Sequence, residues 1–323
     1  MRRFAPIAWS LAAALAASTL VPQVAAAEKK SSHPYLTVQQ LRDKYSDPVG
    51  KIANIDGAEV YYKDEGTGPV LLMVHGSQSS LRTYDRITDQ LKDRYRIIRF
   101  DIPGYGLSGR VSDEVAANVS PTDVPAKLLA QLGVKNVDCV GVSSGGTMCL
   151  YLAARHPELV NRLILSNMPS DPVKTDHMVQ PDSFIKAQAQ ATETGFRDLH
   201  FWNEFLSYFA GDPARISTKT RGEYYDFNRR APEKYPITMV ARIGDGKEAR
   251  VLMQGVKQPA LLIWGGRDAL LPPIAADNLA GYLPNAQVSK LILPDVGHYP
   301  PLESPDRFAA LIRSYVETVT PTL

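Results

Sequence analysis

The sequence lacks the patterns that mark common cofactor-binding and nucleic-acid-binding proteins. Its 323 residues contain no metal-ligand spacing of histidine, cysteine and acidic residues and no phosphate loop. They also contain no basic block or stripe of the kind that binds nucleic acid. We therefore expect no cofactor, no metal and no nucleic-acid partner.

Long apolar runs are missing after residue 27, since no later stretch reaches the roughly 18 apolar residues that a membrane span needs. At the start of the chain, Arg2 and Arg3 precede an apolar run over residues 4–21, and a run of alanines ends at Ala27. This layout predicts a secretory signal peptide over residues 1–27. A membrane anchor is the alternative, but the weak hydrophobicity of alanine favours cleavage near Ala27. The protein would then be periplasmic or secreted, by either the Sec or the twin-arginine route.

An excess of charge of one sign is missing as well. Removing Arg2 and Arg3 from the 36 basic residues leaves 34, which equals the number of acidic residues.

Cysteine is scarce, with two residues in the chain. Cys139 falls on a predicted strand and Cys149 on the helix predicted to follow it, so they can pair if strand and helix pack suitably. Because cysteine is among the residues most often fully buried, we expect two buried thiols.

What the chain does have is a regular alternation of short apolar strands and helices. Apolar runs at residues 70–74, 137–142 and 260–264 are separated by segments with helical spacing. This pattern predicts an α/β fold with a mostly parallel central sheet flanked by helices. Ligands of such sheets bind beyond the carboxyl ends of the strands, so residues that directly follow a strand are the candidates for a site.

The alternation stops between residues 169 and 246, a helical stretch that holds 11 of the chain's 27 aromatic residues. We interpret it as an inserted, mainly helical cap over the carboxyl edge of the sheet. Residues 51–168 and 247–323 would form the α/β core, and residues 28–50 a polar lead-in after the signal peptide 1–27. A plain helical elaboration with an ordinary core is the alternative, and it is compatible with a cap.

Residues 141–145, GVSSG, match the pattern G-x-S-x-G between a predicted strand and a predicted helix. Such a turn holds the central serine, Ser143, in a strained backbone conformation with its hydroxyl exposed, and glycines are needed where strand and helix nearly touch. A turn or N-cap serine is the alternative, because five-residue patterns also arise by chance. However, Asp268 and His298 follow the last two predicted strands, so a serine, an acid and a histidine fall on one edge of the sheet.

With these residues in place, the chain resembles the α/β-hydrolase fold proteins that carry a cap domain, over roughly residues 50–320. The resemblance rests on the order of Ser143, Asp268 and His298, which is the family's order of nucleophile, acid and histidine. It also rests on the segments VHGS, DIPGYGLS, GVSSGG, GGRDALLPP and DVGHYPPLESP. It implies the α/β-hydrolase fold and a serine hydrolase activity.

The resemblance also implies roles for these residues. His298 would take the proton from Ser143 and later give it to the leaving group, while Asp268 would fix the tautomer of His298 and stabilise the imidazolium. Asp295, three residues before the histidine, and Asp171, just past a strand, are the rivals of Asp268 for the acid.

Other residues would complete the site. The backbone N–H groups of Ser144 and Ser77 are expected to form the oxyanion hole. His75 is expected to brace the loop that holds Ser77 and not to act as a second base. Trp202 and Met168 are expected to contact the substrate.

A serine nucleophile disfavours haloalkane dehalogenase and epoxide hydrolase chemistry, which need a carboxylate at that position. We expect an exported serine hydrolase that forms an acyl-enzyme and cleaves a carboxylic ester with a small to medium apolar or aromatic group. A C–C bond hydrolase, an amidase and a prolyl aminopeptidase are alternatives with the same triad; for the last, Glu204 or Glu223 could hold the substrate amine. A ligand-binding protein on the same scaffold is the alternative of another class. The sequence determines neither the exact substrate nor the oligomeric state.

Overall fold

The computed structural model of the protein describes residues 34–231 and 246–321. The predicted signal peptide 1–27, the first part of the predicted lead-in and residues 232–245 of the predicted cap lie outside the described residues. Within the described ranges, no helix is both long enough and apolar enough to cross a bilayer.

In the described part of the chain, eight strands form one sheet in the order β1-β2-β4-β3-β5-β6-β7-β8. Strand β2 is antiparallel to both of its neighbours, and every neighbouring pair from β4 to β8 is parallel. The sheet is therefore mostly parallel, as the sequence predicts. The strands are β1 Lys51–Ile55, β2 Ala58–Glu65, β3 Val70–Val74, β4 Arg96–Phe100, β5 Val137–Val142, β6 Val160–Ser166, β7 Ala260–Gly265 and β8 Val288–Leu293.

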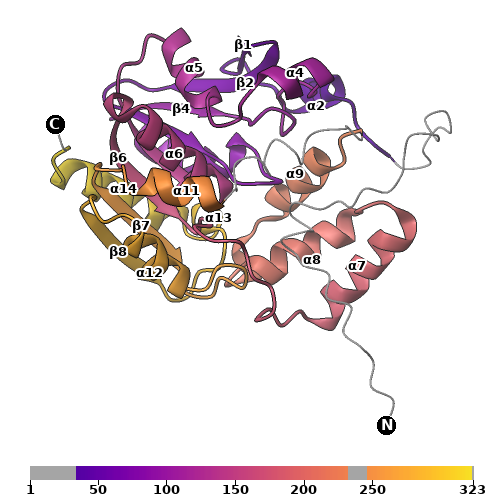
Figure 1. Ribbon diagram of the computed structural model, residues 1–323. Helices are drawn as coiled ribbons and strands as arrows, with labels where there is room; N and C mark the ends of the chain where they lie inside the picture. Colours follow the sequence, from indigo (N-terminus) through magenta and orange to yellow (C-terminus); the bar gives the residue numbers. More distant parts are fainter. Residues whose placement is uncertain (1–33, 232–245, 322–323) are drawn as a thin grey trace.

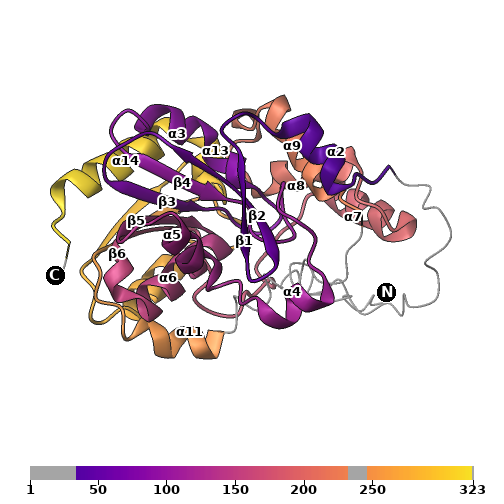
Figure 2. The same cartoon turned by 90° about the horizontal axis from the view of Figure 1, so that it is seen from above.

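Helices cover both faces of the sheet, because the central strands are apolar on both sides (Figure 2). Along β3, Leu71 and Met73 belong to the core under α3 and α14, whereas Leu72 and Val74 belong to the core on the opposite face, under α5 and α6. This is the period of two that a strand imposes on its side chains. The helices packed on the two faces are α3 Asp85–Leu91, α5 Val124–Gln131, α6 Ser144–Arg155, α11 Gly246–Met253, α12 Ile274–Gly281 and α14 Pro305–Thr318.

Three further helices form a group beside the sheet, which we call the α7–α9 layer: α7 Asp182–Thr194, α8 Leu199–Phe209 and α9 Thr218–Asn228 (Figure 1). Its aromatic side chains pack on one another, and the ring of Phe184 lies 6.2 Å from that of Phe205 and 6.4 Å from that of Phe209. Helix α2 (Val38–Tyr45) is attached to this layer, because Asp226 of α9 accepts a hydrogen bond from the Tyr45 hydroxyl at 2.6 Å.

Short helices complete the connections between these elements. They are the 3-10 turns η1 Leu81–Tyr84, η2 Pro157–Leu159 and η3 Pro213–Arg215 and the α-helices α4 Asp113–Asn118 and α13 Pro300–Glu303.

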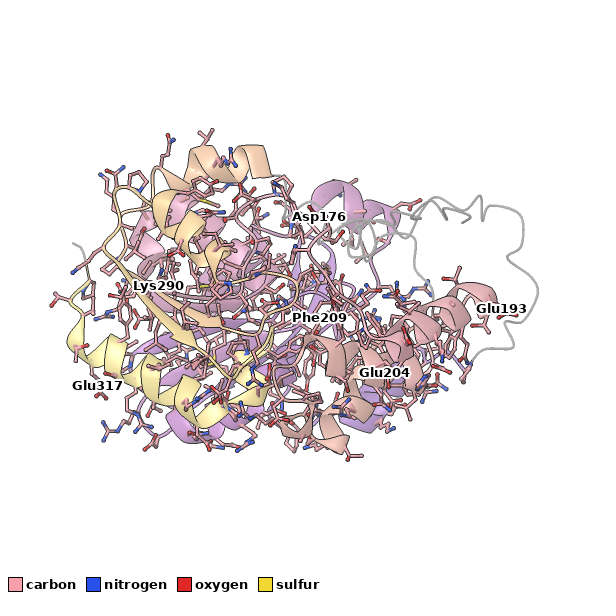
Figure 3. The ribbon with its side chains drawn as sticks, turned by 90° about the horizontal axis from the view of Figure 1, so that it is seen from below. Asp176, Glu193, Glu204, Phe209, Lys290 and Glu317 are labelled. Carbon is pink, nitrogen blue, oxygen red and sulfur yellow. A yellow bond between two sulfur atoms is a disulfide. The ribbon has the colours of Figure 1, made fainter. Side chains whose placement is uncertain are left out.

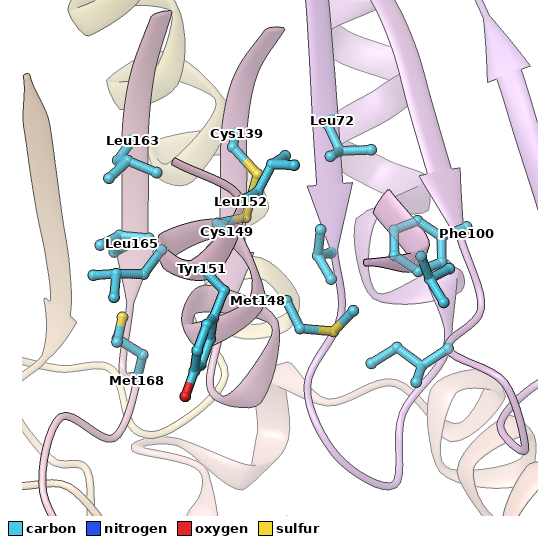
Figure 4. Close-up of a cluster of buried hydrophobic side chains, with 14 of the residues drawn as sticks. Leu72, Phe100, Cys139, Met148, Cys149, Tyr151, Leu152, Leu163, Leu165 and Met168 are labelled. Carbon is cyan, nitrogen blue, oxygen red and sulfur yellow. A yellow bond between two sulfur atoms is a disulfide. The ribbon is translucent and has the colours of Figure 1, made fainter. Parts of the chain in front are cut away.

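The expectation of two free thiols was wrong. Cys139 of β5 and Cys149 of α6 are both fully buried, as expected, but they are joined by a disulfide (Figure 4). The reason is that α6 begins directly at the end of β5 and folds back along it. This brings the two Cα atoms to 5.8 Å, within the range that a disulfide requires.

Candidate active site

Ser143 lies in the sharp turn between β5 and α6. Its backbone has φ 53° and ψ −132°, a conformation that non-glycine residues rarely adopt. A Cβ added to Gly141 would lie 2.5 Å from the carbonyl oxygen of Gly145, and one added to Gly145 would overlap the backbone of Val74. The glycines of the GVSSG segment are thus required because strand and helix touch, as the sequence predicts.

His298 and Asp268 are in direct contact. Nδ1 of His298 lies 2.8 Å from Oδ2 of Asp268, and both residues are buried. On the other carboxylate oxygen, Asp268 accepts the backbone N–H groups of Leu270 and Leu271 at 2.8 and 3.0 Å. A carboxylate acceptor at Nδ1 places the proton of a neutral imidazole on Nδ1 and leaves Nε2 as the basic nitrogen.

The two rival acids are engaged elsewhere. Asp295 pairs with Arg307 at 2.9 Å and with Arg215 at 2.8 Å, and its hydrogen bond from Arg307 lowers the pKa of its carboxyl to about 2. Asp171 pairs with Arg250 and accepts a hydrogen bond from the Tyr282 hydroxyl at 3.0 Å. Of the three candidate acids, Asp268 is the one that contacts His298.

One pocket brings Ser143 and His298 together. It contains about 470 Å³ of empty space, part of which opens to solvent. Its walls come from the core on one side and from the α7–α9 layer on the other, through Phe205 and Phe209 of α8 and Tyr224 of α9. Phe209 lies where α8 meets the core, whereas Glu193 lies at the far end of the layer (Figure 3). The layer therefore supplies an apolar wall to the pocket of the serine and the histidine.

The backbone N–H groups of Ser77 and Ser144 lie in segments that meet beside Ser143. Within the described chain, neither N–H donates a hydrogen bond to another residue. The two side chains are linked, because Oγ of Ser77 lies 3.1 Å from Oγ of Ser144. Gly76 permits the close approach of this loop, since a Cβ there would come within 2.9 Å of the Cβ of Ser143.

His75 is fully buried between two loops and does not line the pocket. Its Nδ1 lies 2.7 Å from the carbonyl oxygen of Gly76, and its Nε2 accepts the backbone N–H of Ile102 at 3.0 Å. Burial lowers the pKa of His75 to about 4, so the ring is neutral near pH 7 and joins the two loops.

Trp202 and Met168 are not among the described residues that line the pocket. Trp202 turns into the α7–α9 layer, where its ring lies 5.2 Å from that of Phe201. Met168 is fully buried against α6, and a Cβ on Gly146 would come within 2.8 Å of its own Cβ (Figure 4). Both side chains pack in the hydrophobic core, and their contact with a substrate stays a prediction.

Glu303 is a buried residue whose part in the site the sequence analysis missed. Its Oε1 accepts the backbone N–H of Gly297 at 2.9 Å, and its Oε2 accepts that of Gly211 at 2.8 Å. It thereby joins the loop that carries His298 to the segment after α8. Burial raises the pKa of the Glu303 carboxyl, and these backbone donors oppose the rise. A lone acid inside the PPLESP segment gave no signal of this role, because its partners are backbone groups.

A second, smaller cavity lies next to the pocket and shares Ser79, Thr83 and Tyr224 with it. Glu223 borders this cavity and pairs with Arg82 at 3.2 Å, while Glu204 lies out on α8 (Figure 3). Neither acid is among the described residues that line the pocket of Ser143. In the described ranges no group of three or more histidine, cysteine and acidic side chains is placed to hold a metal ion.

A family model described as the alpha/beta hydrolase fold matches residues 69–305. The chain belongs to the α/β-hydrolase fold family. The matched segment contains strands β3 to β8, the turn at Ser143 and His298, whereas β1 and β2 precede it.

Curated relatives of the chain are named for two different reactions. It is 30% identical to a pimeloyl-[acyl-carrier protein] methyl ester esterase of Chromobacterium violaceum, over 78% of this chain and 96% of that protein. It is 27% identical to a 2-hydroxy-6-oxononadienedioate/2-hydroxy-6-oxononatrienedioate hydrolase of Burkholderia vietnamiensis, over 83% of this chain and 96% of the relative. Both relatives are hydrolases.

Among solved structures, the chain is similar to a 2-hydroxy-6-oxo-6-phenylhexa-2,4-dienoate hydrolase from a Rhodococcus strain. The TM-score is 0.68 at 17% identity, over 84% of this chain and 99% of the other. At this identity the likeness shows the fold alone.

Proposed function

We propose that the protein is a serine hydrolase that cleaves a carboxylic ester through an acyl-enzyme. The observation that carries the proposal is the contact of His298 with Asp268 at 2.8 Å, beside a pocket that is lined by both His298 and Ser143, the latter in the strained turn. With Nδ1 committed to Asp268, Nε2 of His298 is the base for the hydroxyl of Ser143.

The reaction would proceed in two balanced halves. Oγ of Ser143 attacks the ester carbonyl as its proton passes to Nε2 of His298, and the N–H groups of Ser77 and Ser144 stabilise the oxyanion. The C–O bond to the alcohol then breaks, and His298 protonates the departing oxygen. Water, deprotonated by Nε2 of His298, attacks the acyl carbonyl, the bond from the acyl carbon to Oγ breaks, and His298 returns the proton to Oγ, which releases the acid and restores Ser143.

The pocket walls favour an uncharged ester over a dianionic substrate. Aromatic side chains of the α7–α9 layer line the pocket, and no lysine or arginine is among its described lining residues. The Burkholderia relative is named for a dioate, which carries two carboxylates, and such a substrate needs cationic partners when buried. We therefore place a small to medium apolar or aromatic ester ahead of a C–C bond substrate of that kind.

The decisive experiment compares substrate classes on one preparation. The protein without residues 1–27 is assayed on 4-nitrophenyl esters from acetate to octanoate, on a matched anilide and on a ring-fission diketone. We expect the highest kcat/KM on an ester, stoichiometric labelling of Ser143 by a fluorophosphonate, and neither turnover nor labelling in Ser143→Ala. A higher kcat/KM on the diketone or anilide would replace the ester assignment. Folded protein that takes no label would favour a ligand-binding role.

We also propose that the protein is exported after cleavage near Ala27. The Cys139–Cys149 disulfide supports this, because structural disulfides form and persist in oxidising compartments and are rare in the bacterial cytoplasm. Fractionation of cells that express the full chain, with N-terminal sequencing of the product, tests it. Uncleaved protein confined to the cytoplasm would contradict the proposal.

A further inference from the structure

Asn167 is a buried residue that the proposed triad leaves without a role. It directly follows β6, it is fully buried, and its backbone is left-handed with φ 43°. Asparagine tolerates this conformation better than most residues, but it still costs free energy. Such a conformation persists only where the surrounding contacts impose it.

The contacts of the Asn167 side chain determine the orientation of its amide. The backbone N–H of Gly265, at the end of β7, lies 3.2 Å from Oδ1, and an N–H group can only donate. The hydroxyl of Ser166 donates to the same oxygen at 3.0 Å. Nδ2 is therefore the atom on the other side, and it donates to Oδ2 of Asp268 at 2.6 Å.

Asn167 and His298 thus meet on one oxygen of Asp268. Oδ2 receives Nδ2 of Asn167 at 2.6 Å and Nδ1 of His298 at 2.8 Å, while Oδ1 receives two backbone N–H groups. With four donors the carboxylate cannot turn about its own bonds without losing hydrogen bonds.

We propose that Asn167 is a positioning residue: it fixes Oδ2 of Asp268 so that the carboxylate holds His298 in the correct tautomer and orientation. The inference rests on the proposed function. Asn167 is not among the described residues that line the pocket, so it would act through Asp268 and not on the substrate. A purely structural clamp between the ends of β6 and β7 is the alternative.

Two substitutions that tolerate the left-handed backbone separate these roles. Asn167→Gly removes the amide without adding backbone strain. Asn167→Asp keeps the shape but replaces the donor with a carboxyl that faces Asp268. For each variant, kcat, KM and the pH profile are measured. The concentration of active sites is taken from fluorophosphonate labelling, so that unfolded protein does not lower the value of kcat.

For Asn167→Gly we expect kcat to fall about 10- to 100-fold with KM changed less than about twofold, because a misplaced catalytic group slows the chemical step and not binding. For Asn167→Asp we expect a larger loss and an activity optimum at lower pH. A protonated carboxyl can donate to Asp268, whereas an ionised one repels it. The control is Ser166→Ala. It removes the hydroxyl that donates to Oδ1 of Asn167 but leaves the backbone N–H of Gly265 on the same oxygen, so it should keep kcat within about twofold.

The result that would contradict this inference differs from the result that would contradict the proposed function. If the wild-type protein neither turns over esters nor takes the label, the proposed function is wrong. If the wild type is active and both Asn167 variants keep its kcat and pH profile per labelled site, while only the melting temperature falls, Asn167 is a structural clamp and our inference is overturned.

Discussion

The hydroxyl of Ser77 lies 3.1 Å from that of Ser144. Ser77 belongs to the loop after β3, and Ser144 is the first residue of α6, so this hydrogen bond joins two segments that are distant in sequence. These are the segments whose backbone N–H groups we propose as the oxyanion hole. The two side chains therefore help to set the separation of the two donors.

The adjacent serines of the turn should differ sharply when substituted. Ser143→Ala should lower kcat on a 4-nitrophenyl ester by at least about a thousandfold, because the nucleophile is gone. Ser144→Ala keeps the backbone N–H and loses one hydrogen bond worth about 1 kcal/mol, so a loss within about tenfold is expected.

A double-mutant cycle tests the link between the two hydroxyls. If Ser77→Ala removes the same hydrogen bond as Ser144→Ala, the double variant should lose little more kcat than either single variant. Losses that multiply would mean that the two hydroxyls act separately.

For the adjacent serines of the turn, equal losses in Ser143→Ala and Ser144→Ala would mean that the roles of Ser143 and Ser144 are wrongly assigned.

Asp268→Asn should lower kcat by about ten-thousandfold while leaving the fold intact. The amide nitrogen would donate to Nδ1 of His298, which moves the imidazole proton to Nε2 and removes the base. Asp295→Asn is the matched control, since Asp295 pairs with Arg307 and Arg215 outside the pocket, and it should keep most of the activity. A larger loss from Asp295→Asn than from Asp268→Asn would reverse the assignment of the acid.

The disulfide should contribute to stability, because it closes the loop that contains the Ser143 turn. Replacing both Cys139 and Cys149 by alanine should lower the free energy of unfolding by about 2–3 kcal/mol, which urea denaturation measures. Thiol titration of the denatured, unreduced protein checks the premise. Two reactive thiols per chain in that titration would show that the disulfide does not form.

His75 should make stability depend on pH in the acidic range. Burial lowers the pKa of His75 from its ordinary value of 6.5 to about 4 in the folded chain, so between these pH values the unfolded chain binds more protons. The free energy of unfolding should therefore fall as the pH drops from 6.5 to 4, by up to about 3 kcal/mol from this residue.

The measurement compares wild type with His75→Gln, which removes the titrating ring, in urea at several pH values. The exposed His200→Gln is the control for loss of a histidine as such. We expect a flatter dependence between pH 4 and 6.5 in His75→Gln alone. An unchanged slope in that variant would contradict a neutral, buried His75.

Prediction from sequence succeeded where a local residue pattern is compatible with only one kind of structure. The apolar runs at β3, β5 and β7 predicted strands buried on both faces, and the glycines around Ser143 predicted the tight turn that the structure has. Strand β1 was not anticipated, because the alternation of Lys51–Ile55 is short and its pairing with β2 is decided by neighbours.

The substrate contacts expected of Trp202 and Met168 remain predictions. An aromatic residue on an amphipathic helix faces either a pocket or its own layer, and helical spacing alone does not distinguish them. Trp202 turned into the α7–α9 layer, whereas Phe205 and Phe209 on the same helix line the pocket. Met168, which directly follows the strand-end residue Asn167, packs in the core.

By itself the sequence determined the α/β alternation, the order of Ser143, Asp268 and His298 and their places at strand ends, because these depend on residue type and local spacing. Tertiary structure decided which acid reaches His298, whether the cysteines pair, and what Asn167 and Glu303 contact. Those outcomes depend on distances between segments that are up to about a hundred residues apart, and hydrogen bonds to backbone groups leave no signature in residue type.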